Sequence, residues 1–281
     1  MRAVIVLALL GMLAVSPAAS APAAPPKPHR IVSLNPCLDS VLVRIADPEQ
    51  IAAISHYSHD PRATSIIPLA QALRFPITSG TAEEVIAKQA DLVIAGPHVA
   101  LPTIHALQKL GIPLIQMGVP QSVADSRKEI SRLAAAIGQS TRGKRLNAAI
   151  DAALDRAEPH DQALVPALIW QGGGMVPGAG TLADELLRRT GFANMSSAYG
   201  LQQWDVLPIE HLLARPPRVL LSVGAEGQRD RMLSHPVMRD LSKHIAIRAY
   251  SPRLLHCGGP TIIDAVDRLS QIRRSLKAKT R

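Results

Sequence analysis

Aromatic residues and cysteines are scarce in this chain of 281 residues, and each scarcity excludes a class of protein. Phe, Trp and Tyr together account for 2% of the residues. Single-stranded nucleic acids bind largely by stacking on such rings, so a net charge of +9 does not by itself indicate a nucleic-acid surface. The basic residues are also scattered, apart from a short C-terminal tail. Two cysteines exclude a disulfide-rich scaffold and permit a single intramolecular pairing.

The chain also lacks a hydrophobic run long enough to cross a membrane. The longest, Val4–Val15, has 12 residues, whereas a membrane-spanning helix needs about 20. Met1-Arg2 precedes this run and Ala19-Ser20-Ala21 follows it, which is the pattern of a cleaved secretory signal peptide. We therefore predict a signal peptide over 1–21, a Pro- and Ala-rich linker over 22–28, and a soluble exported protein. A buried N-terminal helix is the alternative.

Motifs of catalysis and cofactor binding are missing as well. The glycine-rich stretch 172–181 lacks the Gly-Lys-Ser/Thr of a phosphate-binding loop and the third glycine of a dinucleotide fingerprint. The chain contains no G-x-S-x-G elbow and no zinc-binding C-x-x-C or H-E-x-x-H. We therefore predict a non-enzymatic protein with no catalytic residues, no cofactor of its own and no metal site. The glycine-rich stretch could still hold an anionic ligand group through backbone N–H groups.

What the chain does contain is an alternation of strand-length apolar runs and amphipathic helical stretches, which is typical of α/β proteins with parallel sheets. The expected strands cover 30–34, 51–55, 91–95, 112–116, 167–170, 218–223 and 245–249. The expected helices between them cover 38–45, 82–88, 102–110, 182–189, 208–214 and 261–275.

Length and pattern together predict two lobes. About 260 residues follow the signal peptide, more than one compact core usually holds. Residues 142–158 carry apolar side chains at helical spacing, and a helix of that length spans about 25 Å. We predict that this helix bridges the lobes, with the first lobe over 29–138, the bridging helix over 139–160 and the second lobe over 161–281.

A short internal repeat supports two similar lobes. Residues 81–90 and 208–217 share a glutamate, an apolar pair, an alanine and a basic residue, each feeding an expected strand. Glu83 and Glu210 match at an offset of 210 − 83 = 127. Such a match is expected where one structural unit occurs twice.

The candidate ligand contacts follow from this architecture, because open parallel sheets bind ligands beyond the carboxyl ends of their strands. The rare aromatic residues that fall near those ends would suit a planar or bulky ligand. The residues that follow the expected strands, with these rings, are Cys37, His56, Tyr57, His59, His98, Trp170, Gly172, Gly173, Trp204, Tyr250 and Cys257.

Two alternatives stay open within this set. Cys37 and Cys257 either form a disulfide between the lobes or remain as two thiols in the cleft, because the sequence does not determine the Cα separation that a disulfide requires. His56, His59 and His98 match no zinc spacing. They are either ordinary polar loop residues or contacts to a metal that the ligand itself carries.

Five segments carry a resemblance to a known family. They are RIVSLNPCLD at 30–39, SHYSHDP at 55–61, ADLVIAG at 90–96, GTLADELL at 180–187 and CGGP at 257–260. These segments resemble the periplasmic substrate-binding proteins of iron-complex and cobalamin ABC importers. The similarity extends from about residue 29 to about residue 273.

The resemblance implies two Rossmann-like α/β lobes with parallel sheets, joined by a single long helix, with the ligand held between them. In such proteins a surface glutamate on each lobe pairs with arginines of the membrane permease, which implies docking roles for Glu83 and Glu210. Acidic residues also favour the first turn of any helix, so these glutamates have a purely structural alternative. Tyr57 and Trp204 match aromatic pocket positions of the cobalamin binders.

We therefore expect a monomeric periplasmic protein that delivers a metal chelate, cobalamin or another corrinoid, to an ABC importer permease. A ferric siderophore or haem is the alternative cargo, and the ligand would carry the cobalt or iron. Two other functions stay open: a two-lobed enzyme of the metal chelatase kind, and a periplasmic carrier without an importer.

Overall fold

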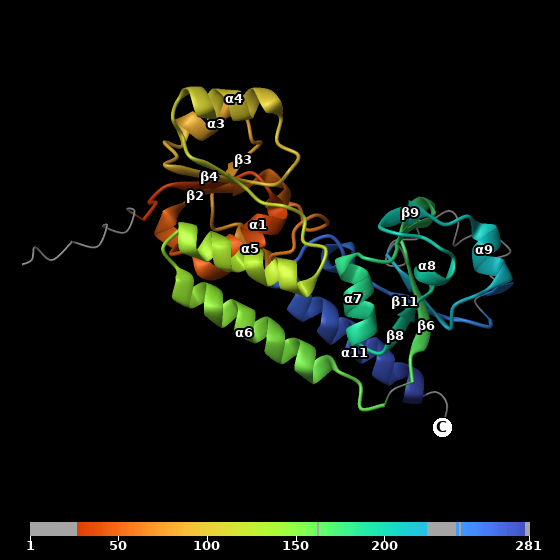
Figure 1. Ribbon diagram of the computed structural model, residues 1–281. Helices are drawn as coiled ribbons and strands as arrows, with labels where there is room; N and C mark the ends of the chain where they lie inside the picture. Colours follow the sequence, from red (N-terminus) through yellow and green to blue (C-terminus); the bar gives the residue numbers. More distant parts are fainter. Residues whose placement is uncertain (1–26, 162, 224–239, 242, 279–281) are drawn as a thin grey trace, which may run out of the picture.

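The computed structural model describes residues 27–161, 163–223, 240–241 and 243–278. The predicted signal peptide and most of the predicted linker lie outside these residues. Figure 1 shows two α/β lobes side by side above a pair of long helices. The prediction of an α/β fold with two parallel sheets is confirmed.

The first lobe is built on a five-stranded parallel sheet with the strand order β3-β2-β1-β4-β5. Its strands are β1 (Ile31–Ser33), β2 (Ile51–Ser55), β3 (Ile77–Thr78), β4 (Leu92–Ala95) and β5 (Leu114–Gln116). Its helices are α1 (Pro36–Ile45), α2 (Leu69–Ala72), α3 (Ala82–Ala87), α4 (Leu101–Lys109) and α5 (Val123–Ala136), with short turns η1 (Pro48–Gln50) and η2 (His56–His59).

The second lobe is built on a four-stranded parallel sheet with the order β11-β10-β6-β8, beside an antiparallel pair β7-β9. Its strands are β6 (Val165–Trp170), β7 (Met175–Pro177), β8 (Phe192–Asn194), β9 (Trp204–Val206), β10 (Val219–Ser222) and β11 (Ala246–Ala249). Its helices are α7 (Leu182–Arg189), α8 (Met195–Ala198), α9 (Ile209–Ala214) and α11 (Thr261–Ala278), with turns η3 (Gly172–Gly174) and η5 (Pro252–Leu254).

Capping residues explain where several of these helices begin. The side chains of Asn35, Thr81, Ser122 and Thr181 each accept a hydrogen bond from a backbone N–H in the first turn of the helix that follows. Those N–H groups have no partner within the helix, so a capping oxygen removes the cost of leaving them unpaired. Two of these caps, Asn35 and Thr181, start helices directly at the junction of the lobes.

The expected bridging helix is α6 (Ser140–Ala157). It packs on α1 and α5 of the first lobe and on α11 of the second. Close approach to α5 depends on Gly143, where an added Cβ would lie 2.4 Å from the Cβ of Ala134. The idea that α6 alone joins the lobes is not confirmed, because α11 runs beside it and one continuous apolar cluster includes core residues of both lobes.

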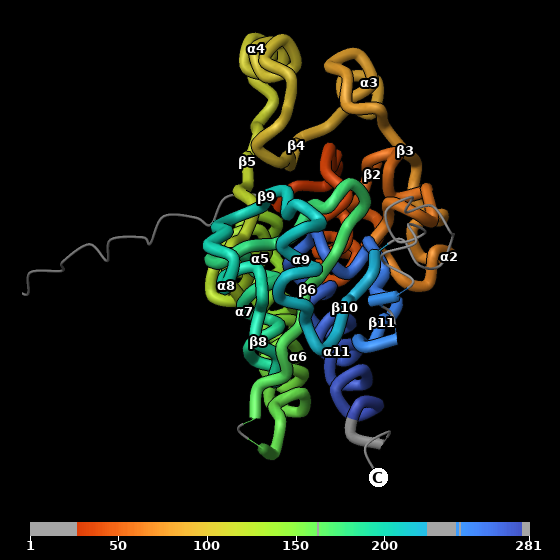
Figure 2. The backbone as a smooth tube through the Cα atoms, turned by 90° about the vertical axis from the view of Figure 1, so that its right-hand side faces the viewer, coloured from red at the N-terminus to blue at the C-terminus, as the bar shows by residue number. Residues whose placement is uncertain are grey.

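Figure 2, turned by 90°, shows the second lobe in front of the first, with α3 and α4 projecting at the top and the ends of α6 and α11 at the bottom. Within the described residues, no helix combines the length and the apolar character that a bilayer crossing would require.

Candidate ligand-binding site

The carboxyl ends of strands from both sheets lead into the junction between the lobes, where the lobes are tied together covalently. Cys37 in the first turn of α1 forms a disulfide with Cys257, which precedes α11, and their Cα atoms lie 5.1 Å apart. The alternative of two free thiols is therefore wrong. Fixed in this bond, neither sulfur is a free ligand-contacting thiol, although Cys37 lines a cavity at the junction.

Hydrogen bonds reinforce the disulfide on both sides. The N–H of Gly259 donates to the Ser126 hydroxyl of α5 over 2.7 Å. The Ser65 hydroxyl of the first lobe donates to the carbonyl of Arg253 over 3.0 Å. These contacts join segments that are more than 130 residues apart in the chain. The disulfide and these hydrogen bonds thus hold the junction in one arrangement, unlike a flexible hinge.

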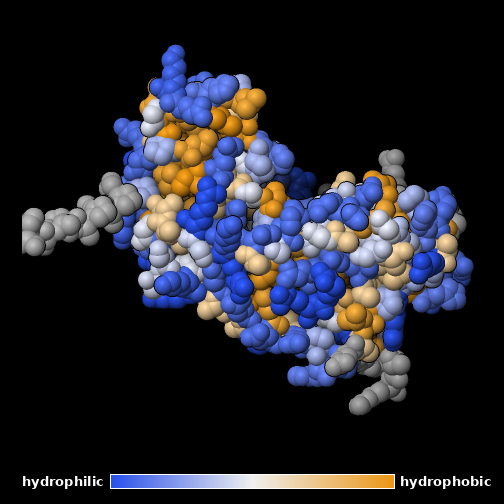
Figure 3. All heavy atoms as spheres, in the orientation of Figure 1, coloured by the Kyte–Doolittle hydropathy of each residue, from blue (hydrophilic) through white to orange (hydrophobic). Residues whose placement is uncertain are grey.

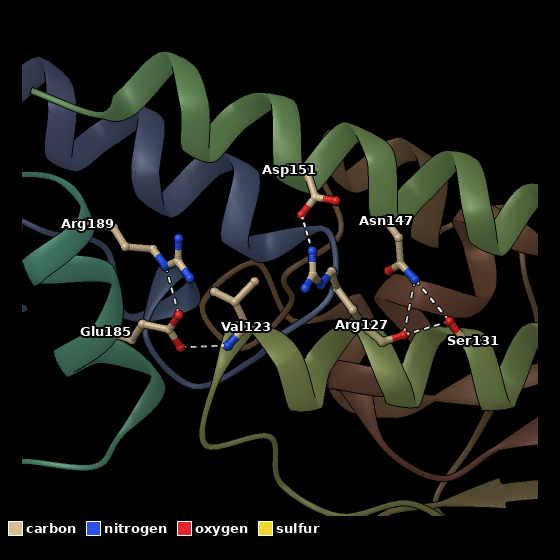
Figure 4. Close-up of polar contacts among 7 residues, drawn as sticks. All are labelled: Val123, Arg127, Ser131, Asn147, Asp151, Glu185 and Arg189. Atoms are coloured by element: carbon tan, nitrogen blue, oxygen red, sulfur yellow. Dashed lines mark hydrogen bonds and ion pairs between the residues drawn. The ribbon is translucent and has the colours of Figure 1, made fainter.

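A carboxylate of α7 adds a further tie, which Figure 4 shows in close-up. Oε2 of Glu185 accepts from the N–H of Val123, the first residue of α5, over 2.8 Å, while its Oε1 accepts from Arg189 over 2.7 Å. Nearby, Arg127 of α5 forms an ion pair of 2.6 Å with Asp151 of α6. The start of α5 therefore has a charged partner from the second lobe.

Two cavities lie at this junction, and Figure 3 shows a hollow in the surface between the lobes. One, of about 130 Å³, is lined by residues of both lobes, including Val119 and Gln121 from the first and Leu182, Trp204 and His256 from the second. The other, of about 70 Å³, extends behind the disulfide into the first lobe. Both open at the carboxyl edges of the sheets, where the sequence predicts ligand contacts.

Two of the seven aromatic side chains, those of Tyr57 and Trp204, are exposed at the ends of strands. Tyr57 is 54% exposed on η2, directly after β2, and Trp204 is 37% exposed at the start of β9. Each ring lies beside a histidine: the centroids of Tyr57 and His56 are 4.0 Å apart, and those of Trp204 and His256 are 5.5 Å apart. Each lobe therefore presents one exposed aromatic–histidine pair.

The other two aromatic residues predicted to contact a ligand, Trp170 and Tyr250, are buried. Trp170 is fully buried in an apolar cluster of the second lobe with Leu168 and Val176. Tyr250 is 3% exposed, and burial raises the pKa of its phenol. Full burial leaves no ring surface for a ligand, so these two assignments are wrong. Both follow an apolar strand, and the pattern did not reveal that their rings turn back into the core.

The three predicted histidines differ in their contacts. A ring nitrogen of His56 lies 3.3 Å from the carbonyl of Thr78, and one of His59 lies 3.1 Å from the carbonyl of Ala72. The contact of His59 binds its turn to α2. His98 is exposed after β4. In the described part of the chain, no three His, Cys, Asp or Glu residues form a group that could hold a metal ion.

Gly172 and Gly173 lie exposed on η3, at the carboxyl end of β6. Gly173 has a φ of +78°, which favours glycine, and no atom lies within 4 Å of where a Cβ would stand at either position. The turn is therefore open enough for a ligand group to approach its backbone.

Two junction residues escaped the sequence prediction. His256 faces Trp204 and lines both cavities, and burial lowers the pKa of its imidazole. The signal for it was its position beside Cys257. Asp39 is completely buried in the first turn of α1 and accepts hydrogen bonds from Ser55 and Ser58 around Tyr57. Asp39 ends the segment 30–39 that carries the family resemblance, but that pattern assigned it no role.

The two glutamates of the repeat, Glu83 and Glu210, are both exposed in the first turns of α3 and α9. The neighbouring Glu84 differs, because it accepts hydrogen bonds from Thr78 and Ser79. Glu83 and Glu210 make no such contact with the described residues, so their carboxylates are open to a partner.

Comparison with known proteins places this geometry in context. Residues 31–245 match the family model of the periplasmic binding proteins. No curated protein matches the chain significantly. Among solved structures, a periplasmic heme-binding protein from Roseiflexus sp. RS-1 is 23% identical, with a TM-score of 0.71 over 87% of this chain and 97% of that one.

Two further structures have the same fold. A possible iron-binding periplasmic solute-binding protein from Staphylococcus epidermidis is 17% identical, with a TM-score of 0.73 over 88% of this chain and 98% of that one. The periplasmic vitamin B12-binding protein of Vibrio cholerae is 18% identical, with a TM-score of 0.65 over 88% of this chain and 97% of that one.

Proposed function

Because this chain belongs to the periplasmic binding protein family, we propose that it captures a metal chelate between its two lobes and delivers it to an ABC importer permease. Cobalamin or a related corrinoid is the first candidate cargo. The protein acts as a periplasmic monomer and does no covalent chemistry. Three solved structures with this fold are described as a heme-binding, a vitamin B12-binding and a possible iron-binding protein, which supports a metal chelate as the ligand class.

The observation that carries this proposal is the pair of exposed rings, Tyr57 and Trp204. Exposed aromatic surface is costly in water, and this chain buries most of its few aromatic rings. Tyr57 comes from the first lobe, directly after β2, and Trp204 from the second, at the first residue of β9 in the antiparallel pair. A flat macrocycle held between the lobes would cover both rings.

Cobalamin fits without a metal ligand from the protein, because its cobalt brings its own axial ligands. Haem is the second candidate, and a specific contact favours it. The exposed Tyr57 ring and the imidazole of His56 lie side by side directly after β2, and the hydroxyl of the one or the imidazole of the other can ligate haem iron. Ferric siderophores belong to the same ligand class and are the third cargo to test.

The direct test is titration of the purified mature protein with cyanocobalamin, haemin and a ferric hydroxamate, followed by calorimetry and absorbance. We expect one-to-one binding of cyanocobalamin with a dissociation constant below about 1 µM, equivalent to about 8 kcal/mol. A haem Soret band shift would instead identify haem as the cargo. Steady turnover of a porphyrin or corrinoid with free metal would replace the proposal with the chelatase function, and no binding at all would overturn it.

Delivery is tested separately by reversing the charge of the two docking glutamates. We expect E83K/E210K to bind ligand as the wild type does, but to reduce uptake of labelled ligand by cells at least about tenfold, since like charges at an interface cost about 1.4 kcal/mol or more. The matched control is E49K/E158K, which reverses two exposed glutamates away from α3 and α9. Unchanged uptake in the first variant would indicate a carrier without an importer.

A further inference from the structure

The turn that carries Tyr57 is held by one buried carboxyl group. Oδ2 of Asp39 accepts a hydrogen bond from the N–H of Ser55 over 2.9 Å and another from the hydroxyl of Ser58 over 2.6 Å. Ser55 ends β2 and Ser58 directly follows Tyr57, so the two bonds enclose the ring-bearing residue. Ser58 is fully buried while Tyr57 is 54% exposed, so fixing the serine on the inside fixes the direction of the ring on the outside.

Asp39 also connects this turn to the second lobe. It lies two residues after Cys37 in the first turn of α1, and Cys37 is bonded to Cys257. The path from Tyr57 through Asp39 to the disulfide crosses only buried or covalent contacts. The first turn of α1 therefore fixes the position of the Tyr57 ring relative to the second lobe.

The surroundings of Asp39 contain no countercharge. Its side chain is completely buried, and its Oδ1 has no hydrogen-bond partner among the described residues. Burial raises the pKa of Asp39 to about 7, while Ser33, Ser58 and Ser55 lower it. A carboxyl group in such a site changes its charge near neutral pH.

Charged and titratable groups on the neighbouring elements are directed elsewhere. On η2, His56 and His59 face the carbonyls of Thr78 and Ala72. From α6, Arg142 pairs with Asp47 beyond the far end of α1. From β1 and β2 only serine groups face Asp39, and Arg44 of α1 lies in its last turn. None of these charges is among the causes of the pKa shift of Asp39.

We propose that Asp39 is a positioning residue for ligand binding, whose carboxyl group holds the η2 turn so that the Tyr57 ring stays exposed beyond the end of β2. The inference rests on the proposed function in so far as Tyr57 contacts the ligand. It assigns a role to a residue that itself touches no ligand.

Because Asp39 can change its charge near neutral pH, the stability of the η2 turn depends on pH. The folded-state pKa is raised from 3.8 to about 7, so the contribution of Asp39 to stability is fully present below about pH 4 and is lost progressively as the pH rises to about 7, where the buried carboxyl group ionises. An ionised carboxylate in this dry site draws water in and loosens the turn. Ligand affinity is therefore expected to fall between pH 6 and pH 8. The fall is about fivefold if ligand binding raises the pKa of Asp39 by most of one unit.

The key variant is D39N, because asparagine has the shape of the neutral acid and can accept the same two hydrogen bonds. We expect D39N to bind cyanocobalamin or haemin as the wild type does at pH 6, and to change less than about twofold by pH 8. S58A removes one of the two bonds and should weaken binding several-fold, on the order of the effect of one hydrogen bond. The matched control is D184N, which alters a similarly buried carboxylate bonded to Asn194 in the second lobe.

A measurement without ligand separates this inference from the proposed function. The chain has three tyrosines, so ring-¹³C-labelled tyrosine gives three sets of NMR signals, and Y57F assigns those of Tyr57. We expect the Tyr57 signal to shift with a midpoint near pH 7 in the wild type and in H56Q, but not in D39N. H56Q removes the one titratable ring that stacks on Tyr57.

The outcomes are distinct. A Tyr57 signal that responds to pH equally in wild type and D39N would overturn the role of Asp39, as would a wild-type pH dependence of affinity that persists in D39N. The Tyr57 signal could also respond to pH in wild type and H56Q but not in D39N, while the protein binds neither cyanocobalamin nor haemin. That result would support the role of Asp39 in holding the η2 turn and would overturn the proposed cargo.

Discussion

Removing both exposed rings is expected to abolish most of the ligand affinity. Y57A and W204A should each weaken binding about 30-fold, or about 2 kcal/mol, which is typical of buried aromatic contacts at the centre of a binding site. The two rings belong to different lobes, so the double variant should lose about a thousandfold if the effects add. Calorimetric titration with the cargo identified for the wild type measures both effects.

Conservative and remote variants sharpen this test. Y57F and W204F keep a ring at each position and should retain most of the affinity if stacking dominates, whereas a large loss in Y57F alone would indicate that the hydroxyl ligates a metal. L164A removes an apolar side chain that is 54% exposed and lies outside the two junction cavities, so it should bind normally. Full affinity in the double alanine variant would exclude these rings from the ligand site.

Removing the disulfide is expected to have the largest effect on stability. Cys37 and Cys257 are 220 residues apart in sequence, so their bond closes almost the whole described chain into one loop. Loops of that size restrict the unfolded chain strongly, and C37A/C257A should lose about 4 kcal/mol of unfolding free energy. For a protein of this size that loss lowers the melting temperature by roughly 10 °C. Thermal unfolding with and without a reducing agent measures it.

The same variant should also affect binding, but less. Without the bond the lobes keep the contacts of Gly259 with Ser126 and of Glu185 with Val123. The cleft is then less preorganised, and we expect affinity to fall several-fold rather than disappear. Reduction of the wild type should reproduce the variant, while reduction of C37A/C257A should change nothing. A melting temperature unaffected by reduction would mean that the disulfide does not constrain the unfolded chain as described.

Local pattern was sufficient for most of the fold. The strand expected at 51–55 is β2 with the same bounds, and the helix expected at 182–189 is α7 with the same bounds. The helix α5, with 14 residues, is absent from the sequence prediction, but most of the other absent elements are short, such as β3 with two residues and α2 with four. Segments that short contain too few residues for a period of 2 or 3.6 to be visible, and their neighbours in space determine them.

The candidate site was less predictable than the fold. A strand-end position indicated both Tyr57, which is 54% exposed, and Trp170, which is completely buried. Both residues follow apolar strands, and only the packing of the second lobe decides that the Trp170 ring joins Leu168 and Val176 in the core. The sequence patterns assigned no role to His256 or Asp39, because their contacts are made with residues far away in sequence.

The amino-acid sequence alone therefore determined the class of architecture and the family resemblance, and it predicted the edge of each sheet as the place for a ligand. These depend on local periodicity and on strand direction, which the chain encodes residue by residue. Only the tertiary structure decided that Cys37 and Cys257 are bonded, which rings are exposed, and that Asp39 holds the Tyr57 turn. The disulfide, the exposure of each ring and the Asp39 contacts depend on which side chains from distant parts of the sequence pack together and exclude water. The folded arrangement of the two lobes determines this packing.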